Sequence, residues 1–530
     1  MSQKRQDKDF DSHFRQIGSL TALSRLLGFV RDICLAQFIG AGAAADAFLV
    51  AFKLPNLFRR LTADGAMTNA FLPVFASVRQ TQGRQAALIL AVEVQVMLFL
   101  CLSLIVIIGE IFMPFVIAFL APGFRQDTEL FEATVSLARI TLPYLPMISL
   151  VALWAAVTNA HNRFFGGAAA PVILNICLIG GTLMVPVLSY QAPATMSLFD
   201  LVMPVCVAVL LAGVAQMMLM QRMLARIDAV LVWSRPRLSD NSKRMWRAFL
   251  PAALGAGGLQ LNLLIDMILA SLVSVGAISW LYYADRIVQL PLGIIGIALG
   301  TALLPQLSKL ESENDTQEVA RRIAHSLHIA AFFAMPATIA IFLISDILIS
   351  GLFGYGAFTK QDSAMAAMAL SAYGVGLMAF VVNKVFQPSF FASERGHIVF
   401  KISILTVLVN IAGSLLMMPY LGHVGLALAT AIASWIGVIV MAVLLAGEGR
   451  LTIAALAPLL RIFISACLMG LVLFVVQIVM ASVLGSLKLA DLIMTIVMVI
   501  TGLLSYFGLS YLFGTIPPFL FRRLRISRKA

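Results

Sequence analysis

The chain has 530 residues, of which 61% are hydrophobic and 12% are charged, and its formal net charge is +12. Soluble proteins carry roughly 25% charged residues, so this composition excludes an ordinary soluble domain. The lysines and arginines gather in particular gaps between apolar runs, so membrane topology accounts for the positive charge and nucleic acid is not expected as a partner.

Apolar runs near 20 residues recur from one end of the chain to the other, and each can cross a hydrocarbon core of roughly 30 Å. We therefore predict an all-α polytopic membrane protein with fourteen transmembrane helices. The predicted spans are 17–39, 45–63, 86–116, 134–158, 168–188, 198–220, 247–274, 280–305, 322–350, 364–391, 398–419, 424–446, 454–482 and 489–513.

The polar gaps between these spans alternate between cation-rich and cation-poor. The N-terminal segment, the gap with Arg79 and Arg84, and the tail after residue 515 belong to the cation-rich set. Short gaps with few cations, such as the one at Lys360, form the other set. By the positive-inside rule, both termini are expected in the cytoplasm.

The longest gap, 221–246, is basic and contains Trp233 and Trp246. Such a segment is typical of an amphipathic linker on the cytoplasmic membrane surface. A plain linker that obeys the charge rule remains the alternative.

The chain also contains an internal repeat with an offset of about 230–236 residues. IGAGAAADAFLVAFKLP (39–55) parallels VSVGAISWLYYADRIVQLP (273–291), and PGFRQD (122–127) parallels GAFTKQD (356–362). Arg163 matches Arg395, and Asn175 matches Asn410. The repeat predicts two six-helix lobes related by an axis along the membrane normal.

These signals predict five regions. They are an N-lobe (1–220), the linker (221–246), a C-lobe (247–447), an extra helix pair (448–515) and a basic cytoplasmic tail (516–530).

Charged residues occur at membrane depth in the first two spans, where each costs roughly 2.5–3.5 kcal/mol and usually faces a cavity or a partner. They are Arg25, Arg31, Asp32, Asp46, Lys53, Arg59, Arg60 and Asp64. In the second lobe, the matching region holds Asp285, Arg286 and Gln289. Because the first lobe is the more cationic, we predict a central cavity that holds an anion. The alternative is that Arg25 and Arg31 pair with Asp32 and Asp46 as struts between helices.

Other motifs have structural interpretations. The glycines of GAGAAA (40–45) are expected in a tight turn between two spans, because no strand precedes them. Gly296 and Gly300 form a GxxxG pattern, which predicts close helix packing. Pro55, Pro73, Pro291 and Pro305 are expected to break or kink helices. No P-loop sequence is present, which argues against ATP hydrolysis.

The runs SRLLGFVRDICLAQFIGAGAAADAFLVAFKLPNLFRRLTADGAMTNAFLP (24–73) and SWLYYADRIVQLPLGIIGIALGTALLPQLSK (279–309) resemble the MurJ/MviN lipid II flippase family. That family belongs to the multidrug/oligosaccharidyl-lipid/polysaccharide exporter superfamily. The resemblance implies that the chain flips lipid II, an undecaprenyl-diphosphate-linked disaccharide-pentapeptide, from the cytoplasmic to the periplasmic leaflet for peptidoglycan synthesis. It also implies that the extra helix pair forms an apolar groove for the polyprenyl tail.

The resemblance extends to site residues. Similar to the family's cavity residues are Arg25, Arg31, Asp46, Asn56, Arg59, Asp285 and Arg286. We expect Arg25, Arg31, Arg59 and Arg286, with Lys53 and Asn56, to bind the substrate. Asp32, Asp46 and Asp285 are expected to act in gating or ion pairing. Gln289 stands where the family often has an acid.

Some relatives in this family hold a sodium ion. Asp266, Asn410 and Thr430 resemble its ligand positions, and Ser414 stands where a second carboxylate would be. No cofactor is expected beyond Na⁺ or the membrane potential as an energy source.

The predicted protein is thus a transporter and not an enzyme. It is expected to lie in the bacterial inner membrane among phospholipids and to function as a monomer. One alternative is a drug or cation antiporter, or another lipid-linked oligosaccharide exporter, of the same superfamily. Another is a membrane-embedded glycosyltransferase, which would need larger extramembrane loops.

Overall fold

The computed structural model describes residues 2–62, 66–191, 197–258, 261–313, 315–452, 457–484 and 490–517. Within these ranges the chain forms helices and turns and contains no strand, so the prediction of an all-α protein is confirmed. Packing divides the chain into two compact units. The first unit comprises Met1–Gly276 with Gly356–Phe358, and the second comprises Ala277–Tyr355 with Thr359–Ala530.

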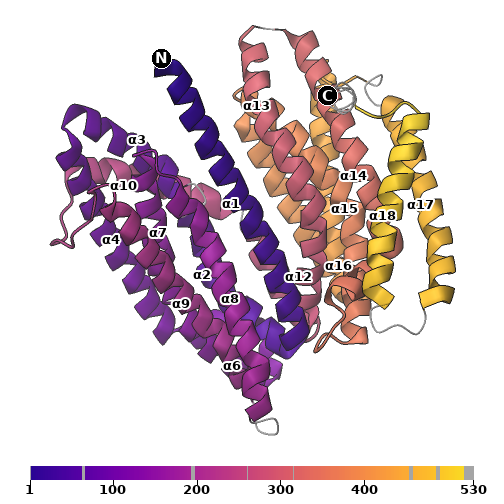
Figure 1. Cartoon of the computed structure of the whole chain (residues 1–530), viewed down its shortest axis with the longest axis horizontal. Coiled ribbons are helices and arrows are strands. Elements are labelled where there is room, and N and C mark those ends of the chain that lie inside the picture. Colours follow the sequence, from indigo (N-terminus) through magenta and orange to yellow (C-terminus); the bar gives the residue numbers. More distant parts are fainter. Residues whose placement is uncertain are drawn as a thin grey trace. The chain divides into compact units, whose positions relative to one another are not determined.

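The first unit contains eleven α-helices in its described parts and one short 3₁₀ helix (Figure 1). They are α1 (Ser2–Ile39), α2 (Ala43–Thr62), α3 (Ala66–Thr81), α4 (Arg84–Ile111), α5 (Met113–Leu120), η1 (Pro122–Gln126), α6 (Thr128–Thr141), α7 (Tyr144–Asn159), α8 (Phe165–Gln191), α9 (Leu198–Ala225), α10 (Asp240–Gly258) and α11 (Leu261–Val273).

The second unit contains seven α-helices in its described parts and one turn of π-helix. They are α12 (Ala277–Pro291), η2 (Leu292–Gly296), α13 (Ile297–Ser312), α14 (Thr316–Phe353), α15 (Lys360–Ala392), α16 (Gly396–Gly447), α17 (Ala457–Leu484) and α18 (Ala490–Leu512).

Several predicted spans differ in detail from the helices observed. Nine helical stretches of the described chain are long and apolar enough to cross a membrane. One of them, α16, joins the two predicted spans 398–419 and 424–446 across a kink at Gly422 (φ 56°, ψ −134°). The predicted spans 134–158, 247–274 and 280–305 are each built from two or more consecutive helices. Helix α3 lies in a stretch to which no span was assigned.

One proline lies inside a helix of the first unit, where a neighbouring helix compensates for its missing hydrogen bond. Pro55 lies inside α2 and has no N–H, so the carbonyl of Ala51 loses its partner within the helix. The hydroxyl of Thr141, at the end of α6, donates to that carbonyl at 2.7 Å. A neighbouring helix thus satisfies the group that proline leaves open, as helix packing in lipid requires.

The glycine interpretations are confirmed. Gly40 has φ +83° in the turn between α1 and α2, a conformation that side chains other than glycine rarely adopt. In the second unit, a Cβ on Gly296 would lie 3.1 Å from the side chain of Lys384. A Cβ on Gly300 would lie 3.4 Å from the backbone oxygen of the same Lys384. The GxxxG pattern therefore lets its helix approach α15 closely.

Equivalent turns in the two sequence copies have the same geometry. Asn162 and Glu394 both adopt positive φ, 56° and 58°. In each case the next residue, Arg163 or Arg395, donates its backbone N–H to the carbonyl five residues before it, at 2.9 Å and 2.8 Å. This local likeness supports the duplication predicted from sequence.

Two further glycines, at equivalent positions of the copies, make equally close contacts within the first unit. A Cβ on Gly123 would lie 1.8 Å from the carbonyl oxygen of Ser271, near the end of α11. A Cβ on Gly356 would lie 2.1 Å from the carbonyl oxygen of Gln37, near the end of α1. No side chain fits at either position. The loop at Gly123, in the first copy, packs on α11 of the second copy, and the loop at Gly356, in the second copy, packs on α1 of the first.

The segment 226–239, within the predicted linker 221–246, begins with a turn at 226–228 and contains no helix or strand. It lies along α4: Arg84 donates to the carbonyls of Ile227 and Asp228, and Trp233 packs edge-on against Phe99 at 5.0 Å. Ser239 donates to the buried carboxylate of Glu93. The segment is therefore a strap held against the first unit.

Packing and sequence repeat divide the chain at different places. The repeat assigns α10 and α11 to the second lobe, whereas they pack within the first unit, α10 against α3 and α11 against η1. The reciprocal glycine contact at Ser271 is one reason. The two-lobe division remains a prediction from the repeat.

Candidate functional site

A cluster of polar side chains surrounds Arg31, near the end of α1. Its Nε and Nη2 donate to Oδ1 of Asp32 at 3.0 and 2.7 Å, and its Nη1 donates to Oδ1 of Asn175 on α8 at 3.1 Å. Asn175 donates in turn to the carbonyl of Ser24 at 2.9 Å. Asp32 is 1% exposed, so the guanidinium is oriented by a buried carboxylate and a buried amide. We call Arg31, Asp32 and Asn175 the Arg31 cluster.

The Arg31 cluster bears on the strut alternative. Asp32 is adjacent to Arg31 on the same helix, so their ion pair does not join two helices. One contact of Arg31 that reaches another helix is to the neutral amide of Asn175 on α8. Arg25, seven residues from Asp32, is exposed and takes part in no hydrogen bond or ion pair of the described residues.

Asp46 lies in the first turn of α2 and is fully buried. Its Oδ2 accepts the backbone N–H of Gly276 at 2.6 Å. Gly276 matches Gly42 in the repeat, so this carboxylate connects the opening turns of the two copies. This hydrogen bond anchors a turn, and the gating or ion-pairing role expected of Asp46 stays a prediction.

Helix α2 carries the other cationic candidates of the first unit. Nε of Arg59 donates to Oδ1 of Asn56 at 3.0 Å, one turn earlier on the helix. Lys53 and Arg59 are both partly exposed. The side chains of Arg60 and of Asp64 lie outside the described residues.

The candidates of the second unit lie on α12. Arg286 donates to the hydroxyl of Tyr282 at 2.8 Å and lies 4.7 Å from the centre of that ring. Gln289 donates to the carboxylate of Asp285 one turn away. An acid at position 289 would repel Asp285, whereas the amide binds it. Since Arg286 belongs to the second unit, its convergence with Arg25, Arg31 and Arg59 stays a prediction.

The sodium candidates also divide between the units. Oδ1 of Asn410 accepts from the hydroxyls of Ser414 and Thr430 at 3.2 and 3.4 Å, in a buried part of α16. Asp266, on α11 of the first unit, accepts from Asn262 at 3.3 Å. Three of the four candidates thus gather around one amide oxygen, and an oxygen-rich cluster of this kind suits a hard cation.

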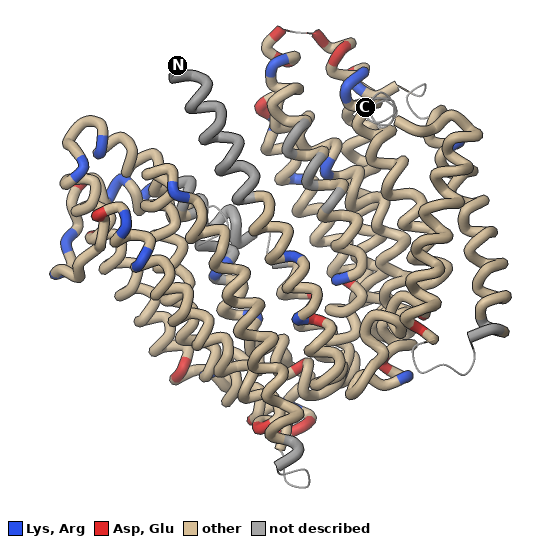
Figure 2. The backbone as a smooth tube through the Cα atoms, in the orientation of Figure 1, with Lys and Arg blue, Asp and Glu red and all other residues tan. Residues whose placement is uncertain are grey.

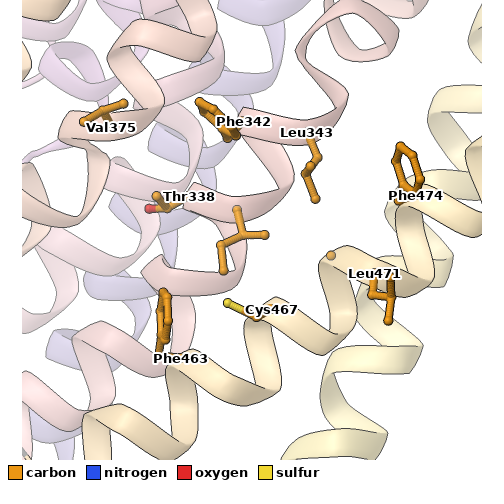
Figure 3. A pocket seen from close by; sticks show the side chains of 10 residues that line it. Thr338, Phe342, Leu343, Val375, Phe463, Cys467, Leu471 and Phe474 are labelled. Carbon is orange, nitrogen blue, oxygen red and sulfur yellow. The ribbon is translucent and has the colours of Figure 1, made fainter.

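An apolar groove of about 520 Å³ opens between α14, α15 and α17 in the second unit (Figure 3). Its lining residues are Thr338, Ile339, Phe342, Leu343, Val375, Phe463, Cys467, Gly470, Leu471 and Phe474. Phe342 and Leu471 are each 60% exposed. The family resemblance implied an apolar groove formed by the extra helix pair. Of the described residues that line this groove, those of the pair belong to α17, and the others belong to α14 and α15.

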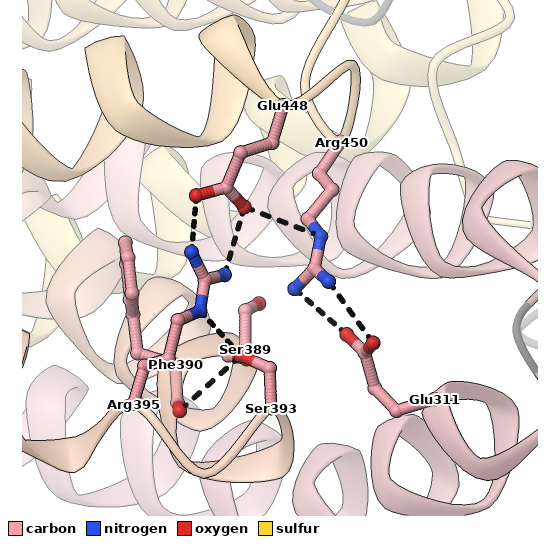
Figure 4. A network of polar contacts seen from close by, with 7 residues as sticks. All are labelled: Glu311, Ser389, Phe390, Ser393, Arg395, Glu448 and Arg450. Carbon is pink, nitrogen blue, oxygen red and sulfur yellow. Dashed lines mark hydrogen bonds and ion pairs between the residues drawn. The ribbon is translucent and has the colours of Figure 1, made fainter.

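An ion-pair network that was not foreseen lies beyond the membrane-spanning segments of the second unit (Figure 4). Arg395, in the turn before α16, binds both carboxylate oxygens of Glu448. Arg450 bridges Glu448, at 3.3 Å, and Glu311 on α13, at 2.7 Å. The Arg395 guanidinium lowers the pKa of the Glu448 carboxyl. Only the match of Arg395 to Arg163 hinted at a role for this turn.

A protein-family model described as "Lipid II flippase MurJ" matches residues 35–500. The chain belongs to the MurJ family. It is 37% identical over 465 residues to a "Probable lipid II flippase MurJ" of Rhizobium meliloti (strain 1021), covering 87% of this chain and 86% of that protein. It is 33% identical over 425 residues to the "Lipid II flippase MurJ" of Burkholderia cenocepacia, covering 79% and 80%.

Solved structures agree in fold. A structure of "Lipid II flippase MurJ, inward closed conformation" aligns with a TM-score of 0.77 at 23% identity, covering 94% of this chain and 98% of that one. An inward-facing multidrug transporter of the MATE family aligns with a TM-score of 0.66 at 16% identity, covering 82% and 97%. MurJ is a transporter family, so the prediction that this multi-pass membrane protein is not an enzyme is confirmed.

Proposed function

We propose that this MurJ-family protein flips lipid II from the cytoplasmic to the periplasmic leaflet of the bacterial inner membrane. The observation that carries the proposal is the Arg31 cluster, in a chain whose relatives are named for this activity. A guanidinium held by a buried carboxylate and a buried amide is oriented before any substrate arrives. Arginine also suits a diphosphate, because its planar fork can donate two parallel hydrogen bonds.

The charge balance of the first unit favours an anionic head group. The first two predicted spans and their edges hold more cations than acids: Arg25, Arg31, Lys53, Arg59 and Arg60 against Asp32, Asp46 and Asp64. Arg25, Lys53 and Arg59 are at least partly exposed. Cations at membrane depth are costly, which favours a functional role for them. In this proposal Arg286 joins them during an alternating-access cycle.

The apolar groove between α14, α15 and α17 is the proposed site for the polyprenyl tail. Its walls are almost wholly apolar, and they come from helices that can cross a membrane. A long hydrocarbon chain in such a groove stays out of water while the polar head passes through the protein.

The decisive experiment is depletion of the protein in cells that carry a periplasmic assay for lipid II. We expect lipid II to disappear from the periplasmic leaflet and to accumulate as a precursor within the cell. Undiminished exposure at full depletion would contradict the proposal. Export of a drug or another lipid-linked oligosaccharide in the same cells would favour the antiporter or exporter alternative.

Both termini and the strap 226–239 are proposed to lie on the cytoplasmic side. In the first unit, lysines and arginines gather around α3 and α10 (Figure 2). By their places in the chain, Arg79 lies near the end of α3, Arg84 begins α4 and Lys243 lies in the first turns of α10. With the native cysteines replaced, Lys360→Cys should react with an impermeant thiol reagent from outside, and Ser239→Cys should not. Labelling of Ser239→Cys in intact cells would overturn this topology. The other predicted outside position, Ala194, lies outside the described residues.

The energy source is proposed to be a sodium gradient or the membrane potential, and the functional unit is proposed to be a monomer among phospholipids. The oxygen cluster around Asn410 supports a sodium ion. Flipping rates in proteoliposomes with imposed sodium gradients or potentials would separate the two sources.

A further inference from the structure

Helix α14 departs from regular geometry at two places. Pro336 has no N–H to donate, so the carbonyl of Phe332, four residues earlier, loses its partner within the helix. Ile344 has φ −121° and ψ 28°, which lie outside the helical region and mark a kink. The segment 337–343 lies between these two breaks.

Helix α18 packs beside α14 (Figure 1), and two of its hydroxyl groups reach α14, one at the proline break and one three residues after the kink. The buried Tyr506 donates its hydroxyl to the carbonyl of Phe332 at 2.6 Å. Its ring also packs against that of Phe332, with centroids 5.2 Å apart. The proline-freed carbonyl is thereby satisfied from outside its own helix.

The second contact lies three residues after the kink. Oγ1 of Thr495 is 2.7 Å from the carbonyl oxygen of Ile347 and 2.9 Å from that of Asp491 on its own helix, so its single proton is shared between the two helices. The approach of the two helices is close here, because a Cβ on Gly351 would lie 2.0 Å from Oγ1 of Thr495. Helix α18 therefore holds α14 on both sides of the segment 337–343.

This segment is also the α14 wall of the apolar groove. It supplies Thr338, Ile339, Phe342 and Leu343, whereas α18 supplies none of the described residues that line the groove. Across the groove, a Cβ on Gly470 of α17 would lie 2.9 Å from the side chains of both Ile339 and Leu343. Small movements of the segment would therefore change the width of the groove.

We propose that Tyr506 and Thr495 are positioning residues that fix the segment 337–343 and so set the width of the groove for the lipid tail of the substrate. The inference rests on the proposed function, in which this groove takes the polyprenyl tail. If the two residues had a merely structural role, they would only hold α18 against α14. Their loss would then slow the transport of every substrate equally.

The first test measures the groove without any substrate. Cys34, Cys101, Cys177 and Cys206 are replaced by alanine in the full-length protein, and the remaining Cys467, which lines the groove, carries a spin label. We expect Tyr506→Phe and Thr495→Val each to raise the mobility of the label. Ser505→Ala is the matched control, because its hydroxyl bonds carbonyls of its own helix. Unchanged label spectra in both test variants would overturn the proposal.

The second test measures flipping of lipid II with an undecaprenyl tail and of an analogue with a short prenyl tail, in proteoliposomes and without the spin label. We expect each variant to reduce the preference for the long tail by about fivefold, which corresponds to the loss of one hydrogen bond. Equal slowing of both substrates, or a wild-type protein that does not distinguish the tails, would overturn the proposal.

The two tests separate the inference from the proposed function. If the wild-type protein flips neither lipid, the proposed function fails, while the Cys467 spectra still report whether α18 positions the segment. If Tyr506→Phe does not accumulate in the membrane, Thr495→Val decides by the same two measurements, because it removes the other hydroxyl contact between α18 and α14.

Discussion

Asn175 and Asn410 occupy equivalent positions in the two sequence copies, and their surroundings differ. Asn175, on α8, accepts from the guanidinium of Arg31. Asn410, on α16, accepts from the hydroxyls of Ser414 and Thr430. Both amides are nearly fully buried. The same side chain therefore orients a cation in one unit and gathers oxygen atoms in the other.

This difference shows how the two copies of a duplicated chain can acquire different binding roles. The backbone of the copies is alike, as the turns at Asn162 and Glu394 show. The side chains around the conserved position of the amide have diverged, towards anion binding in the first unit and towards an environment suited to a hard cation in the second. Substitutions made separately in the first unit and in the second unit test whether the two have these different roles.

The largest effect is expected from Arg31. Arg31→Ala removes charge-assisted hydrogen bonds of about 1.5–3 kcal/mol each, so flipping should fall by roughly 100-fold or more. Arg31→Lys should restore little, because an ammonium lacks the planar fork. Arg139→Gln, which changes an exposed cation on α6, is the control. Flipping is measured in proteoliposomes after the membrane level of each variant is matched.

Exchanging the charges of Arg25 and Asp46 tests the alternative that the two residues form an ion pair between helices. If Arg25 and Asp46 were a pair, Arg25→Asp combined with Asp46→Arg would restore growth. We expect no restoration, because Asp46 accepts the N–H of Gly276 and an arginine cannot accept it. Growth of the double variant at the wild-type rate would show that the strut alternative is right.

The two asparagines should differ in the size of their effects. Asn175→Ala removes one charge-assisted hydrogen bond to Arg31, and a loss of about 1.5 kcal/mol predicts a roughly tenfold lower flipping rate. Asn410→Ala removes the hydrogen bonds that its Oδ1 accepts from the neutral hydroxyls of Ser414 and Thr430, so the rate should fall by no more than about fivefold. A larger loss for Asn410→Ala than for Asn175→Ala would contradict the division of roles between the units.

Much of this comparison could be predicted from sequence. The repeat paired Asn175 with Asn410, and the cost of charge at membrane depth singled out Arg31. The partners could not be predicted, because the contact of Arg31 with Asn175 joins residues 144 positions apart. The breaks inside predicted spans, the strap against α4 and the packing of α10 with the first unit depend on tertiary contacts, which apolar periodicity does not encode.

The sodium candidates allow a test with an effect of intermediate size. If Asp266 contributes the charged ligand, Asp266→Asn should abolish the stimulation of flipping by sodium and leave the basal rate unchanged, because a hard cation loses its carboxylate. The measurement is the flipping rate in sodium and in choline chloride. A wild-type protein with equal rates in the two salts would contradict a sodium site.

The smallest effect concerns the ion-pair network of the second unit. Arg395 lowers the pKa of Glu448, so the folded protein holds this carboxylate ionised more readily than the unfolded chain does. The resulting stability is full above the unfolded pKa, about 4.3, and is lost as the pH falls through the lower folded value. Since the two side chains are 27% and 30% exposed, the pair contributes only about 0.2–1 kcal/mol.

Thermal unfolding of the purified protein at pH 7 and below pH 4 measures this contribution. Glu448→Gln should lower the midpoint slightly at pH 7 and have a smaller effect in acid, where the wild-type carboxylate is itself protonated. Asp240→Asn, at an ion pair whose carboxylate is 99% exposed, should not measurably change the midpoint at pH 7. A Glu448→Gln effect that grows on acidification would reverse the sign argued here and show that the pair with Arg395 is not formed in solution.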